Sequence, residues 1–365
     1  MRDGAGADRW LFIAVIALLG IGVTMVLSTS YLYAQERFSD GTFLFRKQLI
    51  AVGVGLVALL VSTAISPTMV RRLAYPLLGG TLLVLILVLV PGIGVAHGGA
   101  RRWISLGSFV FQPAELAKLS LVLYLAHSLA KKGDKVRTFS VKVLPHLIVG
   151  GVFIGLVLME PDFGVGLMLG VLVLLLLFVA GAKLSHLLYT GLVILPFLAI
   201  YLVGAEYRLR RLAVFLDPWS DASNSGFQII QSYIAFGSGQ FWGRGLGQSR
   251  QKLFYLPEAH TDFIYSVIGE ELGLLGALLV LALFGLIVLR GFRLAMKIHD
   301  PFGQYLAIGL TTLLGLQALI HMGVVMGLMP TKGLVLPFIS YGGSAMVVNL
   351  TGAGLLLGLS RRRIG

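Results

Sequence analysis

The chain has 365 residues, of which 57% are hydrophobic and only 12% charged, and its mean hydropathy is +0.91. This composition excludes a soluble domain, because soluble chains carry about 25% charged residues. The net charge of +13 does not indicate nucleic-acid binding, since the basic residues lie in short loops between apolar segments, where they orient membrane helices and meet anionic headgroups. The lack of cysteine excludes disulfides and thiol nucleophiles.

Apolar segments of membrane length recur along the whole chain, and we predict an all-α, polytopic membrane protein with about ten transmembrane helices. Residues 1–365 are expected to form a single transmembrane domain. The expected spans are 10–30, 46–65, 74–91, 112–130, 143–159, 163–180, 186–204, 262–290, 303–328 and 339–360.

Loop charge sets the expected orientation. Basic residues cluster in loops on one side of the expected spans, at 71–72, 131–142, 183, 290–297 and 361–363. The positive-inside rule assigns that side to the cytoplasm, so both termini are expected there. The N-terminus lacks a cleavable signal pattern and is expected to be a retained first helix.

The connection between the seventh and eighth spans, residues 205–261, is far longer than its neighbours, and long ordered loops are usually functional. Its aromatic content predicts packing on the membrane surface, and 227–236 is typical of a short amphipathic helix in the interface. The glycine run 237–247, with Arg244 inside it, is similar to a phosphate cradle. A flexible turn is the alternative.

Other basic residues are expected on the outer side, where insertion does not require them. They include Arg101, Arg102, Arg244 and Lys252, and also Arg208, Arg210, Arg211 and Arg250. An outward-facing basic surface indicates an anionic ligand, with ordinary loop solvation as the alternative.

The fourth span begins with two charged residues, Glu115 and Lys118, three apart and therefore on one helical face. A structural ion pair is one interpretation; contact between Lys118 and a phosphate of a lipid-linked ligand is the other. The turn between the fifth and sixth spans holds Glu160 and Asp162, which predicts a carboxylate-capped turn, with ligand or metal contact as the alternative.

The eighth span begins with an unusual concentration of ionisable groups, namely Glu258, His260 and Asp262, followed two turns deeper by Glu270 and Glu271. A carboxylate in or beside hydrocarbon is by default a functional candidate. Capping of the eighth span by Thr261 or Asp262 is the structural alternative.

Two prolines and paired glycines interrupt the segment 330–344, which predicts a broken or re-entrant stretch that lines a cavity. Lys332 and Ser340 are candidates to face that cavity. Six of the histidines show no metal-ligand spacing, so no zinc site is expected.

Four of these stretches together resemble the shape, elongation, division and sporulation family of bacterial membrane proteins over essentially the whole chain. They are 251–263 (QKLFYLPEAHTDF), 268–273 (IGEELG), 331–344 (TKGLVLPFISYGGS) and 112–118 (QPAELAK). The first and third are more similar to the cell-division branch than to the elongation branch. Ala114 stands where the family commonly has Ser, a mild departure.

The resemblance implies a peptidoglycan glycosyltransferase that polymerises lipid II, with undecaprenyl pyrophosphate as the leaving group. The essential loop carboxylate of the family corresponds to Asp262. Inverting glycosyl transfer needs a base for the attacking hydroxyl and cations for the departing pyrophosphate, and the outer carboxylates and basic residues meet both needs. A divalent cation, Mg²⁺ or Mn²⁺, is a candidate cofactor, and no other cofactor is certain.

The partner implied by the resemblance is a class B penicillin-binding protein, the septal transpeptidase, joined by other divisome proteins at the division septum of the bacterial inner membrane. Two other functions fit ten spans with broken outer segments: a lipid II flippase and a non-catalytic scaffold that recruits a transpeptidase. The clustering of polar features on the outer face favours the enzyme.

Overall fold

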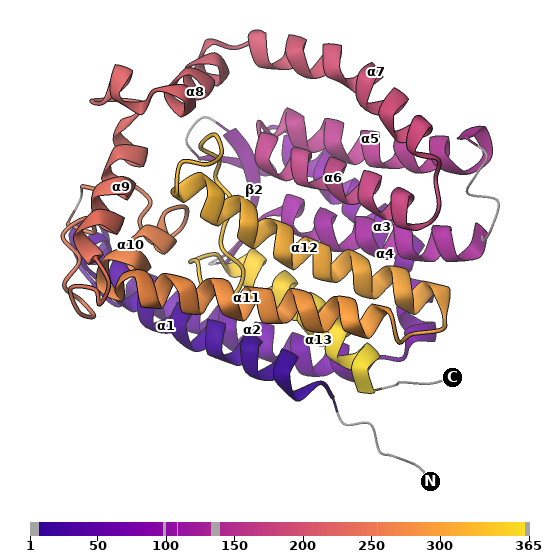
Figure 1. Cartoon of the computed structure of the whole chain (residues 1–365), viewed down its shortest axis with the longest axis horizontal. Helices are drawn as coiled ribbons and strands as arrows, with labels where there is room; N and C mark the ends of the chain where they lie inside the picture. Colours follow the sequence, from indigo (N-terminus) through magenta and orange to yellow (C-terminus); the bar gives the residue numbers. More distant parts are fainter. Residues whose placement is uncertain (1–6, 98–99, 108, 133–138, 254, 362–365) are drawn as a thin grey trace.

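Long apolar helices lie side by side along most of the molecule (Figure 1) in the computed structural model of the chain, which describes residues 7–97, 100–107, 109–132, 139–253 and 255–361. Each expected span contains a helix. These helices are α1 (Arg9–Phe38), α2 (Phe43–Ala64), α3 (Pro67–Leu89), α4 (Pro113–Lys132), α5 (Leu144–Met159), α6 (Phe163–Val179), α7 (Leu184–Val203), α11 (Gly273–Ala295), α12 (Pro301–Val325) and α13 (Gly343–Arg361).

The helices differ in how well they fit a membrane span. In the part of the chain that the structure describes, seven are long and apolar enough to cross a bilayer: α1, α2, α3, Leu184–Tyr201 of α7, α11, α12 and α13. Helices α5 and α6 are apolar but shorter. Glu115 and Lys118 of α4 are buried within the bundle, whereas Lys131 at its end is exposed. The prediction of a polytopic all-α membrane protein is confirmed.

The buried share of each helix shows which helices lie at the centre of the bundle and which lie at its outside. In the most apolar 18-residue stretch of α12 and α13, 83% and 78% of the residues are buried. In that of α7, which arches over the outside of the bundle (Figure 1), only 6% are buried. Small residues allow the close crossings that membrane helices favour. A Cβ at Gly354 of α13 would lie 2.1 Å from Ser62 Oγ of α2, and one at Gly291 of α11 would lie 2.0 Å from Thr311 Oγ1 of α12.

Irregular and short elements collect at one end of the bundle, whereas α1 begins and α13 ends at the other (Figure 1). The loop 205–261 contains α8 (Glu206–Leu216), the 3₁₀ turn η3 (Pro218–Asp221) and α9 (Phe227–Gly239), and the short α10 (Ile264–Glu271) follows it. Helix α9 is the helix expected over 227–236. Its Ser232 Oγ lies 2.8 Å from Ser266 Oγ of α10 and donates to Val325 O at 2.6 Å, so one face packs on protein.

Three features of this end differ from the sequence-based expectation. A three-stranded antiparallel sheet, β1 (Gly94–His97), β2 (Ala100–Leu106) and β3 (Phe109–Phe111), precedes α4, and α8 replaces part of the expected loop. The expected span 262–290 is two helices that meet at Gly273, where φ is +68°. A Cβ there would lie 2.3 Å from Gly243 N, so only glycine admits the neighbouring loop.

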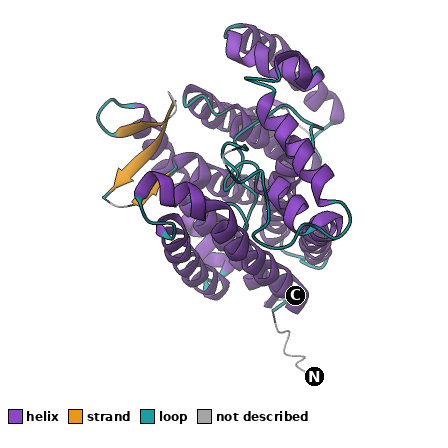
Figure 2. Cartoon of the chain, turned by 90° about the vertical axis from the view of Figure 1, so that its left-hand side faces the viewer, coloured by secondary structure: helices purple, strands orange, loops and turns teal. Residues whose placement is uncertain are grey.

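Residues 331–342, here called the crossing segment, follow α12 without regular secondary structure and are largely buried. A Cβ at Gly22 of α1 would lie 2.4 Å from Phe338 O, so the segment enters the bundle as far as α1. This confirms the expected broken segment, which is tolerated because protein surrounds its backbone. Viewed from this end, loops occupy the middle of the molecule, with helices around them and the sheet to one side (Figure 2).

Candidate active site

Asp262 sits in a tight turn immediately before α10. Glu258 adopts φ +55°, and its carbonyl accepts the N–H groups of Thr261 and Asp262, each at 3.1 Å. The N-cap of α10 is Phe263, with no side-chain capping bond. The alternative in which Asp262 caps this helix is therefore wrong, and its carboxylate accepts no hydrogen bond from the described residues.

The carboxylate of Asp262 lies against the backbone of the crossing segment. A Cβ at Gly333 would be 3.1 Å from Asp262 Oδ2. Gly333 in turn lines a cavity of about 140 Å³, here called the outer cavity. Its walls come from β2 (Arg102), the start of α6 (Asp162, Phe163, Gly164), α8 (Tyr207, Arg208, Arg211, Leu212) and the residues 330–333.

Basic side chains predominate in the outer cavity. Among the described residues, Arg102, Arg208, Arg211 and Lys332 line it, with Asp162 as their acidic neighbour. Arg102 is fixed by two bonds of 2.7 Å, from Nε to Glu160 O and from Nη2 to Pro161 O. Lys332 Nζ lies 4.3 Å from the centre of the Phe163 ring. The arrangement is suited to a multiply charged anion.

Electrostatics set the protonation of this region. Burial, reinforced by Glu258 and Asp162, raises the pKa of Asp262 to about 7, although Arg211 and Arg102 oppose the rise. Burial also lowers the pKa of Lys332 to about 8, against the influence of Asp162. Asp262 is therefore close to half ionised at neutral pH, the range in which a general base works best.

The turn between α5 and α6 is part of this site. Asp162 Oδ1 accepts Val165 N at 3.1 Å, as a capped turn requires, while its buried Oδ2 has no partner among the described residues. Glu160 is fully buried, and burial together with Asp162 raises its pKa to about 8. Arg208 and Arg211 were predicted from the sequence only as members of an outward-facing basic surface, not as site residues, although their spacing of three on a helix puts them on one face.

Three predicted residues surround the site without lining the outer cavity. Ser340 Oγ donates to Thr261 O at 2.7 Å and accepts Leu336 N at 2.8 Å, so it ties the crossing segment to the turn of Asp262. His260 is buried between Tyr33 and Tyr341, with ring centres 5.1 and 5.6 Å away. The exposed Glu258 accepts Thr261 Oγ1 at 2.9 Å.

Arg101 and Arg102 have different roles because neighbouring strand residues point to opposite faces. Arg102 holds the α5–α6 turn, whereas Arg101 is exposed and does not line the outer cavity.

Lys118 and Glu115 lie away from this site, inside the bundle. Lys118 Nζ is 2.7 Å from Glu115 Oε2 and donates to Gln317 Oε1 at 3.0 Å, and no part of Lys118 reaches the surface. Of the two interpretations, the structure favours the structural ion pair over direct contact with a lipid phosphate.

Lys252 is committed to another ion pair. Its Nζ lies 2.9 Å from Glu271 Oε1 and 2.9 Å from Ser28 Oγ of α1. The neighbouring Glu270 accepts Ser249 Oγ at 2.5 Å and Arg250 N at 3.0 Å. Both glutamates therefore fasten the loop 244–252 to α10 rather than face the outer cavity.

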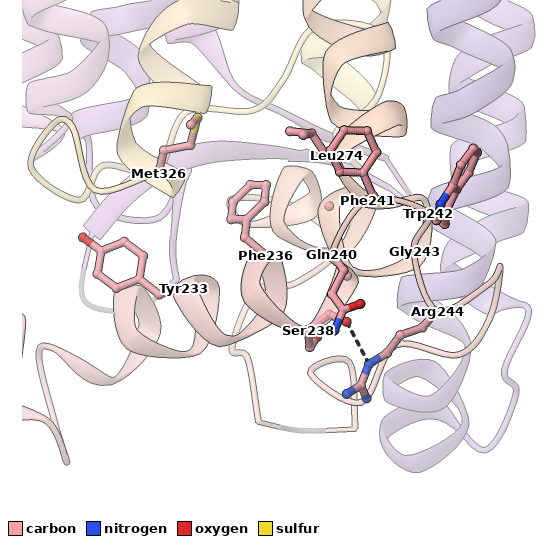
Figure 3. A pocket seen from close by; sticks show the side chains of 12 residues that line it. Tyr233, Phe236, Ser238, Gln240, Phe241, Trp242, Gly243, Arg244, Leu274 and Met326 are labelled. Carbon is pink, nitrogen blue, oxygen red and sulfur yellow. Dashed lines mark hydrogen bonds between the residues drawn. The ribbon is translucent and has the colours of Figure 1, made fainter.

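Arg244 lines a separate cavity of about 900 Å³ with Tyr233, Phe236, Phe241 and Trp242, and its Nε donates to Ser238 O (Figure 3). The phosphate-cradle interpretation of the glycine run is wrong. The N–H groups of Gly243, Arg244 and Gly245 already donate to Gly239 O, Glu270 O and Glu271 O. Positive φ at these glycines serves the turn that makes those bonds.

The family described as "Cell cycle protein", that of FtsW, RodA and SpoVE, matches residues 9–364. The chain belongs to this family. It is 47% identical over 98% of its length to a "Probable peptidoglycan glycosyltransferase FtsW" of Geobacter metallireducens, covering 96% of that protein. It is 39% identical to "Stage V sporulation protein E" of Bacillus subtilis, with 97% of each chain covered.

Solved structures of FtsW, RodA and SpoVE family relatives share the fold. One described as "Structural coordination of polymerization and crosslinking by a peptidoglycan synthase complex" aligns with a TM-score of 0.79 at 32% identity, covering 98% of both chains. The rod shape determining protein RodA of Thermus thermophilus aligns with a TM-score of 0.72 at 31% identity, also over 98% of both chains. Coverage this complete includes the outer loops that build the site.

Proposed function

We propose that the protein is a peptidoglycan glycosyltransferase that polymerises lipid II into glycan strands during septal cell-wall synthesis. One observation carries the proposal: a carboxylate with a pKa of about 7, Asp262, lies against the wall of a cavity lined by four basic side chains. The names of the FtsW relatives and of the peptidoglycan synthase complex support it.

In the proposed reaction, Asp262 acts as general base on the acceptor lipid II. Its carboxylate takes the proton of the 4-hydroxyl of N-acetylglucosamine while that oxygen attacks the anomeric carbon of the growing chain. The bond from that carbon to the pyrophosphate oxygen breaks, and the configuration inverts. The carboxylate suits this task because it has no competing hydrogen bond from the described residues.

The basic residues of the outer cavity serve the leaving group. Arg102, Arg208, Arg211 and Lys332 are placed to neutralise the charge that develops on undecaprenyl pyrophosphate. Fixed cations in a partly enclosed site need little reorganisation during the reaction, which is why such groups lower barriers effectively.

A divalent cation fits this site. The described residues contain no cluster of three His, Cys, Asp or Glu that would hold a metal alone. Mg²⁺ is commonly bound by one or two carboxylates together with substrate phosphates, and Mn²⁺ accepts the same oxygen ligands. Asp162, whose Oδ2 is buried without a described partner, would hold such an ion beside the pyrophosphate and add to its neutralisation.

We further propose a class B penicillin-binding protein, a septal transpeptidase, as the partner, together with other divisome proteins. The relative solved as a synthase complex supports a partner of this kind. The loop charges support the proposal that both termini lie in the cytoplasm and that the outer cavity lies on the outer side of the bacterial inner membrane.

The test uses the purified full-length protein, alone and with its transpeptidase, supplied with labelled lipid II in proteoliposomes. Glycan polymer supports the enzyme. Translocation of lipid II without polymer would identify a flippase, and neither activity with transpeptidase binding intact would identify a scaffold. Divalent cations are added and chelated in parallel to test the metal requirement.

A further inference from the structure

Gln317 of α12 is a fully buried amide that bridges two parts of the molecule far apart in sequence. Its Oε1 accepts Lys118 Nζ at 3.0 Å, and its Nε2 donates to Val335 O of the crossing segment at 2.9 Å. The amide orientation is unambiguous, because a lysine ammonium only donates and a carbonyl only accepts. Lys118 is held in turn by Glu115.

The bond to Val335 fixes the part of the crossing segment that touches Asp262. Val335 is two residues from Gly333, whose backbone lies against the Asp262 carboxylate. The adjacent Leu334 O lies 2.6 Å from Nδ1 of His321, one turn further along α12. Side chains of α12 thus contact two consecutive carbonyl groups of the crossing segment.

The far end of the segment is tied to the turn of Asp262 itself. Ser340 Oγ donates to Thr261 O, and Tyr341 N donates to His260 O at 2.9 Å. The crossing segment therefore connects α12 to the turn 258–262, and the bond from Gln317 holds it at α12.

We propose that Gln317 is a positioning residue for glycosyl transfer, which holds residues 333–335 against Asp262 and so fixes the place and enclosure of that carboxylate. The inference rests on the proposed role of Asp262 as general base. It gives the buried pair Glu115–Lys118 a function as well, because this pair anchors the acceptor side of the Gln317 amide.

Loss of the Gln317 donor leaves the half-buried Val335 O without its partner, and the segment then gains hydrogen bonds by moving toward water. Asp262 loses part of its enclosure, which moves its pKa down toward the ordinary value. Charged groups facing Asp262 are unchanged: Glu258 in its own turn, Asp162 at α6, Arg102 on β2 and Arg211 on α8. A shift in the pH profile therefore reports on the segment.

The test variant is Gln317→Met, which keeps the length of the side chain and removes both hydrogen bonds. With labelled lipid II and the transpeptidase complex, we expect kcat to fall about 10²-fold, the effect of a misplaced reacting group. KM should stay within about threefold because the basic groups remain. The acidic limb of the pH–rate profile should move to lower pH, and amide hydrogen exchange in 331–342 should become faster.

Leu310→Ala is the control, since Leu310 is a fully buried residue of α12 that packs toward Gly352 of α13. It should lower thermal stability without moving the pH limb or the exchange of 331–342. If Gln317→Met does not fold, Gln317→Asn replaces it, because its amide is one methylene too short to reach both partners.

The inference would be overturned if Gln317→Met kept the acidic limb of the parent pH–rate profile and a kcat within about threefold of the parent. Unchanged amide hydrogen exchange in residues 331–342 of this variant would overturn it as well. Failure of the proposed function looks different, since the parent itself then makes no polymer. In that case the exchange measurement still decides whether Gln317 holds the segment.

Discussion

Asp262→Asn is the substitution that tests the proposed chemistry most directly. It keeps the size and shape of the side chain and removes the ability to accept a proton. Loss of a general base slows a reaction by about 10²–10⁴-fold, so we expect no detectable glycan from a protein that still inserts and binds the proposed transpeptidase partner.

The pKa of Asp262 gives this prediction a pH dependence. With a pKa of about 7, the carboxyl is ionised to about one tenth at pH 6 and about nine tenths at pH 8. The parent rate should therefore rise by about tenfold across this range if proton transfer limits the reaction.

The same pKa predicts the effect on stability. The folded-state pKa of about 7 lies above the ordinary carboxyl pKa of 3.8 that applies to the unfolded chain. The carboxyl therefore favours the folded state fully below pH 3.8, and this contribution is lost progressively as the pH rises from 3.8 through 7. A raised pKa of this size corresponds to at most about 4 kcal/mol, an upper limit because Asp262 is partly exposed.

Asp262→Asn should consequently raise the melting temperature relative to the parent by more at pH 8 than at pH 5, where only part of the contribution has been lost. The assays are gel analysis of labelled glycan from lipid II between pH 5.5 and 9, and thermal melting at the two pH values. Asp217→Asn is the matched control, since this exposed residue caps η3 through Trp219 N at 3.1 Å and asparagine caps equally well. Polymerisation by Asp262→Asn within about threefold of the parent would refute the base assignment.

Three further predictions concern the alkaline pH limb, the buried ion pair and the membrane orientation. Because the amine of Lys332 has a pKa of about 8, its positive charge is lost above that pH, and the rate of polymerisation should fall there. Lys332→Arg should remove this fall in rate at alkaline pH. An identical fall in the parent and the variant would exclude Lys332 as its source. Lys118→Met leaves the buried Glu115 unpaired and should destabilise the fold by about 3–5 kcal/mol. The double variant Lys118→Met/Glu115→Gln should recover stability, and thermal melting measures both effects. A Lys118→Met protein with the stability of the parent would contradict the buried pair. In intact cells with a permeabilised outer barrier, an impermeant thiol reagent should label Ser223→Cys but not Lys297→Cys, both at exposed positions; the opposite pattern would reverse the orientation.

The sequence alone determined the class of the protein and the approximate position of the long helices. Membrane helices are set by local composition, because backbone groups in hydrocarbon must bond within their own segment. For the same reason the break at 330–344 was visible as prolines and glycines. Asp262 could be singled out because charge beside a membrane span is rare.

Tertiary structure decided which polar groups meet. Lys118 and Gln317 are 199 positions apart, and Lys252 and Ser28 are 224 apart, so local periodicity carries no signal for either contact. Arg208 and Arg211 could be placed on one helical face, but not beside Asp162 and Lys332, since that depends on how α8 folds over the bundle. The pKa of Asp262 likewise follows from burial by distant segments, which only the packed chain creates.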